Sequence, residues 1–155
     1  MRRRLLDATD RRIAAVAHLS IGFGVVVGVG FLVGLAVNAV IWLRSRHSPT
    51  VEFHAEQAGA YQLFVLLSNI LFIVVWLGGL AFMMTGLPAG EGLLSFKNVT
   101  IGGWLLLLIP EIVWYFGSIF YGLYAGTKVA IGGEFTYPVI GTWVKRRLTN
   151  RARKF

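Results

Sequence analysis

Residues 13–43 read IAAVAHLSIGFGVVVGVGFLVGLAVNAVIWL, an apolar run of 31 residues that decides how often the chain crosses a membrane. Two further apolar runs, 61–84 and 99–124, follow it, and the 155-residue chain is 56% hydrophobic and only 14% charged. This composition is typical of an integral membrane protein and not of a soluble domain. The later runs, of 24 and 26 residues, each suit one helix across about 30 Å of hydrocarbon. The first run is long for one crossing and short for two.

The positions of the lysines and arginines distinguish these two possibilities, because such residues beside membrane segments are retained on the cytoplasmic side. Five precede the first run, two lie between the first and second runs, one lies between the second and third, and seven follow. If the first run crosses once, six of these lysines and arginines lie on the cytoplasmic side and nine lie outside, against the rule. If it enters and returns, fourteen lie on the cytoplasmic side and one lies outside. The charges therefore favour a hairpin over one long tilted helix with glycine pairs that let a neighbour approach.

The expected fold class is all-α: a polytopic integral membrane protein with four membrane helices, the first two short or tilted and forming the hairpin. The helices are expected at about 13–27, 30–43, 49–84 and 99–126. They form a single membrane domain, 13–138, between a basic cytoplasmic N-terminus, 1–12, and a basic interfacial tail, 139–155. Both termini then face the cytoplasm of a bacterial inner membrane. Glycines crowd the hairpin centre, and those spaced for helix packing are Gly24, Gly28, Gly30 and Gly34.

A polar stretch, VEFHAEQAGAYQL, precedes the second apolar run at residues 51–63. Ser48 is a favoured N-cap residue, and Pro49 suits the first position of a helix. Glu52 and Glu56 lie four residues apart and share a helix face that can reach lipid headgroups or the basic residues just before the helix. The stretch therefore predicts a solvated amphipathic entry to a long membrane helix.

The basic tail alternates cations with apolar residues such as Trp143, a pattern typical of an interfacial helix. Because these cations directly follow membrane sequence, we expect them to bind anionic lipid headgroups and not nucleic acid. The residues concerned are Lys145, Arg146, Arg147, Arg151, Arg153 and Lys154.

Glu111 is the polar residue expected deepest in the membrane. In a regular helix it lies 12 residues after Val99, about 18 Å into a hydrocarbon core of about 30 Å. A carboxylate there has to be neutralised, hydrogen-bonded or paired with a cation of another subunit. The candidate partners within the chain are His18, Asn38 and Asn69. A proton-relay or permeation role and a packing contact beside a proline kink both fit.

No catalytic or cofactor pattern stands out. The chain has no cysteine, Ser68 and Ser118 have no histidine close in sequence, and no phosphate loop occurs. Four residues suggest a metal site at first sight: His47, Glu52, His54 and Glu56. We expect no metal there, because Glu52 and His54 project from different helix faces and no further ligand stands nearby. The chain is predicted to be no enzyme and to hold no cofactor.

Three segments resemble signatures of one known family: AHLS at 17–20, NAVIWLRSRHSPTVEFHAEQAGAYQL at 38–63 and KVAIGGEFTYP at 128–138. It is the family of the twenty-kilodalton subunit of the chloroplast inner-envelope import translocon (Tic), with its small bacterial relatives of unknown function and MamF-type magnetosome membrane proteins. The similarity spans roughly residues 13–139. The resemblance implies a four-helix membrane protein without known catalysis.

The resulting function prediction is a structural or accessory subunit, which packs its glycine-rich surface and Glu111 against a larger membrane protein complex. Its expected partners are anionic lipids and other membrane protein subunits. The alternative implied by the resemblance is a protein-translocation or channel component acting as an oligomer. No segment shows the regular polar stripe that would line an aqueous path in a monomer.

Overall fold

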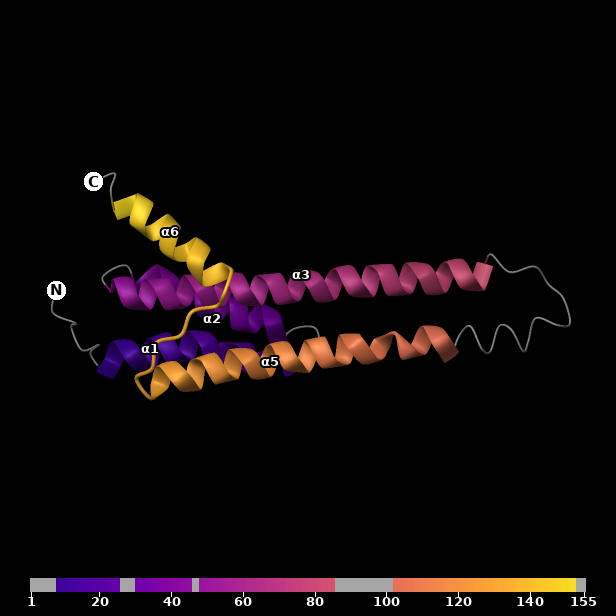
Figure 1. Ribbon diagram of the computed structural model, residues 1–155, viewed down its shortest axis with the longest axis horizontal. Helices are drawn as coiled ribbons and strands as arrows, with labels where there is room; N and C mark the ends of the chain where they lie inside the picture. Colours follow the sequence, from indigo (N-terminus) through magenta and orange to yellow (C-terminus); the bar gives the residue numbers. More distant parts are fainter. Residues whose placement is uncertain (1–7, 26–29, 46–47, 86–101, 153–155) are drawn as a thin grey trace, which may run out of the picture. The chain divides into compact units, whose positions relative to one another are not determined.

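The computed structural model describes residues 8–25, 30–45, 48–85 and 102–152 of the chain (Figure 1). These residues are almost entirely helical, and no strand occurs among them. Two helical stretches, Pro49–Phe82 and Gly102–Ala130, are long and apolar enough to cross a membrane. The all-α class is therefore confirmed, while the four-span topology stays a prediction. The elements are α1 (Ala8–Leu19), the 3₁₀ helix η1 (Ser20–Val25), α2 (Gly30–Arg44), α3 (Pro49–Thr85), α5 (Leu108–Ala130) and α6 (Ile140–Ala152).

The chain divides into two compact units. The first comprises Met1–Phe64 and Ser118–Phe155, and the second comprises Val65–Gly117. The predicted hairpin, the polar stretch and the basic tail all belong to the first unit, whereas Glu111 belongs to the second.

The first unit opens with an antiparallel pair formed by α1 and η1 against α2. The Ser20 hydroxyl lies 3.4 Å from the Gly34 carbonyl and accepts a 3.0 Å hydrogen bond from the Asn38 amide. Ala17, which lies on α1 before Ser20, packs in a cluster with Trp42, which lies on α2 after Asn38. Chain direction therefore reverses between the two arms, as the charge pattern predicted. Gly28, the fourth of the predicted packing glycines, lies outside the described residues.

Close approach of the two arms requires three of the predicted packing glycines. A Cβ atom on Gly30 would lie 1.7 Å from the Phe23 carbonyl oxygen, and one on Gly34 would lie 2.7 Å from that of Ser20. Gly24 is likewise buried, against the Phe31 ring. These glycines pack inside the chain, so the expectation that they form a surface for a larger complex is wrong.

The first α-helix of the pair, α1, begins and ends at earlier residues than predicted. α1 starts at Ala8 instead of residue 13 and gives way to η1 after Leu19. The Ser20 hydroxyl donates to the Ala17 carbonyl at 2.8 Å, which competes with the regular helical ladder, and Gly22 and Gly24 follow. The tighter 3₁₀ turn is the result.

α3 begins as its sequence predicted. The Val51 amide donates to the Ser48 hydroxyl at 3.4 Å and the Glu52 amide to the Ser48 carbonyl at 2.9 Å, with Pro49 at the first helical position. The helix has 37 residues and is therefore about 55 Å long, well above the roughly 30 Å of hydrocarbon. Its first turns belong to the first unit and carry the polar stretch.

The last long helical stretch is interrupted near its start. Residues 102–106 are helical, a turn follows at Leu107, and α5 begins at Leu108. Pro110 explains the break, because it has no amide hydrogen and its ring conflicts with the carbonyl of Leu106 four residues earlier. α5 then continues to Ala130, four residues beyond the predicted end.

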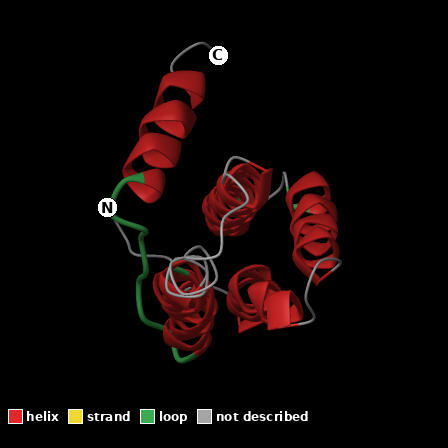
Figure 2. Cartoon of the chain, turned by 90° about the vertical axis from the view of Figure 1, so that its right-hand side faces the viewer, coloured by secondary structure: helices red, strands yellow, loops and turns green. Residues whose placement is uncertain are grey.

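α5 ends in a glycine cap that turns the chain back toward α3. Gly132 has φ of +90°, which favours glycine. The Gly133 amide donates to the Lys128 carbonyl at 2.9 Å and the Gly132 amide to Val129 at 3.0 Å, the pair of bonds of a Schellman motif. The chain leaves this cap as the extended segment 133–138, part of the green loop that leads into α6 in Figure 2.

Candidate functional site

Four polar side chains meet in the core of the first unit: His18, His54, Gln57 and Tyr137. We call them the histidine cluster. They come from α1, from α3 and from the extended segment 133–138, and each is at most 6% exposed. Polar groups buried this deeply are stable only when they are hydrogen-bonded, so their partners define the cluster.

Gln57 binds the backbone of the extended segment as a neighbouring strand would. Its Nε2 donates to the Phe135 carbonyl at 3.1 Å, and its Oε1 accepts from the Tyr137 amide at 3.3 Å. These two bonds satisfy backbone groups that would otherwise be buried without partners. One fully buried side chain of α3 therefore fixes the register of the segment between α5 and α6.

The two imidazoles continue this network. The Tyr137 hydroxyl lies 3.3 Å from His18 Nδ1, His18 Nε2 lies 3.1 Å from His54 Nδ1, and Gln57 Nε2 also lies 3.1 Å from that atom. Burial raises the pKa of the Tyr137 phenol above its ordinary range, so the hydroxyl keeps its proton and can donate it. The consistent assignment is Tyr137 donating to His18, and His18 and Gln57 both donating to His54.

Aromatic rings enclose the cluster. Tyr61 stacks on Tyr137 with ring centroids 4.2 Å apart and planes at 14°, and the Phe135 ring meets His18 edge-on at 5.9 Å. Tyr121 makes edge contacts with both Tyr137 and Phe135. The Tyr61 hydroxyl also donates to the carbonyl of Ser118 at 3.1 Å. The rings keep the polar network away from water.

A second buried polar group centres on Ser20. Its hydroxyl accepts from Asn38 Nδ2 at 3.0 Å and from Gln62 Nε2 at 2.9 Å, while donating to the Ala17 carbonyl. The amide oxygens Oδ1 of Asn38 and Oε1 of Gln62 are buried and have no hydrogen-bond partner among the described residues. Two acceptors of this group are thus unused.

The polar stretch 51–63 is largely buried, which corrects the prediction of a solvated entry. His54, Gln57 and Gln62 are at most 6% exposed. Only the face with Glu52 and Glu56 remains partly accessible, with side chains 17% and 11% exposed. The sequence does contain a signal of this burial, because the buried polar residues alternate at helical spacing with small apolar ones, namely Val51, Ala55 and Ala58.

The three side chains predicted as candidate partners of Glu111 form hydrogen bonds of their own. His18 is bonded within the histidine cluster, Asn38 donates to Ser20, and Asn69 donates to the Val65 carbonyl of its own helix at 2.5 Å. Each of these side chains therefore has another partner, and a hydrogen bond of one of them to Glu111 stays a prediction. Glu111 itself is half-buried at the start of α5.

The basic tail forms α6, whose arginines pair with α3. Arg147 bonds to Glu56, and Arg151 lies 3.4 Å from Glu52. The later arginine on α6 pairs with the earlier glutamate on α3, so the two helices run antiparallel at this contact. The two glutamates therefore pair with arginines of α6, while Arg46, one of the two basic residues before α3, lies outside the described residues.

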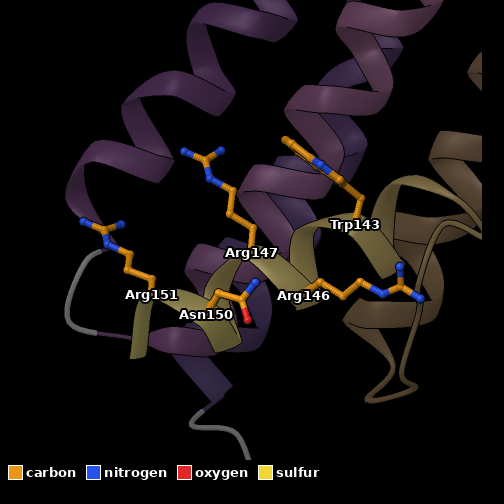
Figure 3. Close-up of a pocket in the computed structure, with 5 residues that line it drawn as sticks. All are labelled: Trp143, Arg146, Arg147, Asn150 and Arg151. Carbon is orange, nitrogen blue, oxygen red and sulfur yellow. The ribbon is translucent and has the colours of Figure 1, made fainter. Parts of the chain in front are cut away.

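The other predicted headgroup ligands divide between exposed and undescribed residues. Lys145 and Arg146 are exposed, while Arg153 and Lys154 lie outside the described residues. Figure 3 shows the basic face of α6, where a hollow of about 490 Å³ is present. Its lining residues are Trp143, Arg146, Arg147, Asn150 and Arg151. The Arg147 guanidinium lies 5.7 Å from the Trp143 ring centroid, within reach of a cation–π contact.

The residues considered for a metal site are separated or already engaged. His54 is bonded in the histidine cluster, Glu52 and Glu56 pair with arginines, and His47 lies outside the described residues. Across the described ranges, no group of three or more histidine, cysteine, aspartate or glutamate side chains is placed to hold a metal ion.

Two apolar helices of membrane-crossing length are typical of a helical membrane protein. The model of the MamF_MmsF family, the magnetosome magnetite crystal formation protein family, matches residues 9–144, and the chain belongs to this family. Comparisons with curated proteins and with solved structures gave no match. The resemblance to MamF-type magnetosome membrane proteins is thus confirmed, whereas nothing in the comparisons connects the chain to the plastid import subunit.

Proposed function

We propose that this protein is a non-enzymatic component of the magnetosome membrane that supports magnetite crystal formation by packing against other membrane proteins. Family membership carries the proposal, since the family is described by its part in crystal formation. The structure supports the packing role through two features. They are the apolar exterior of the second unit and the hydrogen-bonded histidine cluster of the first.

The second unit presents an apolar exterior. Its two helical arms are tied by reciprocal bonds, from Trp76 Nε1 to the Trp104 carbonyl at 3.3 Å and from Trp104 Nε1 to the Trp76 carbonyl at 3.2 Å. Along these arms, large apolar side chains are 62–75% exposed, among them Val74, Phe82, Leu106 and Val113. Water is a poor solvent for such a surface, so lipid or the apolar face of a partner protein has to cover it.

The polar core of the first unit supports a structural role over a catalytic one. Both histidines use their facing nitrogens in bonds to other buried side chains, and the aromatic rings around them exclude water and substrate. In the part of the chain that the structure describes, no serine or threonine hydroxyl bonds to either imidazole. The network holds three segments together instead.

The proposed topology has four membrane segments, with both termini on the cytoplasmic side. The distribution of lysine and arginine supports it. α2 has 15 residues and is about 22 Å long, so the hairpin suits two short or tilted segments better than two full crossings at right angles to the bilayer. The 37-residue α3 and the long stretch 102–130 supply the two full crossings.

The decisive experiment is deletion of the gene in a magnetosome-forming bacterium, with crystal size and shape measured by electron microscopy. We expect the deletion to alter crystal size or shape, and we expect normal crystals to return when the intact gene is supplied. Restoration should fail with the Gln57→Met variant, which removes the bonds to segment 133–138, and succeed with the matched Gln62→Met variant. Crystals that are unchanged by the deletion would refute the proposal.

Gentle solubilisation distinguishes the accessory role from the alternative. A stoichiometric association with a larger membrane complex supports an accessory subunit. A homo-oligomer that conducts ions in liposomes would instead favour the channel or translocation component. The same preparation should contain the anionic lipids expected at the basic residues of α6.

A further inference from the structure

Tyr137 and His18 form a buried pair of a phenol and a base. The Tyr137 hydroxyl lies 3.3 Å from His18 Nδ1, and both side chains are at most 2% exposed. Burial raises the pKa of the Tyr137 phenol above its ordinary range, so the intact side chain keeps its proton. Loss of one electron reverses this, because an oxidised phenol is a strong acid and gives its proton to a base within hydrogen-bond reach. His18 Nδ1 is that base.

A second imidazole extends the path of this proton. With Tyr137 donating to His18, the Nε2 proton of His18 points to His54 Nδ1, which lies 3.1 Å away. A proton received at His18 Nδ1 can therefore be passed on from Nε2 to His54. The exposed carboxylate of Glu134 attracts a positive charge at His54. The positive charge thus stays within a hydrogen-bonded chain, which lowers its cost in a buried site.

An aromatic contact gives the electron a route out of the core. Tyr121 on α5 is 38% exposed, and its ring meets the Tyr137 ring at an angle of 64° with centroids 5.6 Å apart. Electrons tunnel across ring contacts of this size and need no open channel. The aromatic rings that keep water and substrates away from the histidine cluster therefore still let an electron leave through Tyr121.

The neighbouring phenol of Tyr61 lacks such a base. Its ring stacks on that of Tyr137 with centroids 4.2 Å apart, but its hydroxyl donates to the Ser118 carbonyl at 3.1 Å. A carbonyl oxygen accepts a hydrogen bond but is too weak a base to take the proton. Of the two stacked rings, Tyr137 is therefore the one on which a neutral radical can form. Tyr61, itself 8% exposed, shields one face of that ring from water.

We propose that Tyr137 is a redox-active tyrosine, which a one-electron oxidant outside the chain oxidises through Tyr121. The O–H bond of Tyr137 breaks, an N–H bond forms at His18 Nδ1, and the electron passes through the Tyr121 ring to the oxidant. The products are a neutral Tyr137 radical, a protonated imidazole and the oxidant reduced by one electron. Return of one electron and of the proton restores the phenol. This role does not depend on a part in crystal formation, so the two can fail separately.

The test is light-driven oxidation of the full chain in detergent. Because the chain contains no cysteine, a Thr127→Cys substitution can carry a single ruthenium bipyridyl label, which a flash and an external quencher convert to a one-electron oxidant. Thr127 is exposed on α5, about 9 Å along the helix from Tyr121. We expect the electron paramagnetic resonance spectrum of a tyrosyl radical, with hyperfine coupling to nitrogen-15 when the histidines carry that isotope. A radical without this coupling, or no radical although the oxidant forms, would refute the proposal.

Two matched variants of the labelled chain locate the radical. Tyr137→Phe keeps the ring and removes the phenol, so the radical with nitrogen coupling should be lost. Tyr61→Phe makes the same change in the ring stacked on it and should keep both the radical and the coupling. Circular dichroism checks that the helix content of each variant is unchanged, and the nitrogen coupling in the parent chain tests the pair even if Tyr137→Phe does not fold. An undiminished radical signal in folded Tyr137→Phe would place the radical on another tyrosine and overturn the proposal.

Discussion

Replacement of Gln57 by methionine tests how the first unit is held together. Methionine has nearly the same length and shape, so the change removes hydrogen bonds without opening a large cavity. The backbone carbonyl of Phe135 and the amide of Tyr137 lose their partners in surroundings where both residues are at most 7% exposed. At about 1–3 kcal/mol for each orphaned group, the expected loss of unfolding free energy is about 2–6 kcal/mol.

The matched control is Gln62→Met, five residues later in α3. Gln62 is 1% exposed, donates once to the Ser20 hydroxyl and has an unpaired oxygen. After the substitution, Ser20 still accepts from Asn38 and donates to Ala17, and one unpaired buried oxygen is gone. The expected cost is therefore only about 0–1 kcal/mol.

The assay is equilibrium unfolding of both purified variants by sodium dodecyl sulfate in mixed micelles, followed by circular dichroism. Tryptic cleavage at the basic residues of α6 provides a second readout, because a detached segment 133–138 would release α6 without unfolding the rest. We expect Gln57→Met to be the less stable variant by at least about 1 kcal/mol, or to be cleaved much faster. If the two variants unfold and are cleaved alike, Gln57 does not hold the segment and the reasoning is refuted.

Other consequences of the structure can be measured on the same preparation. A double-mutant cycle over Glu56→Gln and Arg147→Gln should give a coupling below about 1 kcal/mol, because the arginine is 55% exposed and solvent screens the pair; a larger value would contradict this view of α6 docking. Gly132→Ala should cost about 1–2 kcal/mol because of its φ of +90°, whereas Gly117→Ala, in open space within α5, should be neutral or stabilising; the reverse order would disprove the glycine cap. Glu111→Gln should leave unfolding unchanged, and a clear loss of stability would indicate a contact of the carboxylate that the described residues do not show. Tags on the two termini should be accessible from the same side of the membrane in intact cells, and opposite accessibility would exclude the proposed topology.

The features that the sequence predicts well are local ones. The cap at Ser48 with Pro49, and the glycine break after α5, depend on residues next to each other in the chain. The reversal within the first apolar run is also predictable, because the charge distribution is sensitive to the number of crossings. These signals need no knowledge of what packs against them.

The candidate site is less predictable, because its partners lie far apart in sequence. Gln57 bonds to a backbone carbonyl 78 residues later, and Glu56 pairs with Arg147 91 residues later. A backbone acceptor leaves no trace in the side-chain pattern, so Gln57 resembles any solvated polar residue. The same difficulty applies to the candidate partners of Glu111, because each of those three side chains bonds to a group that its own sequence pattern does not reveal.

The histidine cluster also has a consequence for biosynthesis. His18 and Tyr137 are separated by 119 residues, and Gln57 and Tyr137 by 80. At about 5–20 residues per second, a ribosome needs about 4–16 seconds to make the last of these stretches. During that interval the nascent chain contains both imidazoles and the Gln57 amide before the residues that cover them exist. Chains that stop before Phe135 should therefore be targets of quality-control proteases, even though every long apolar helix has already been made.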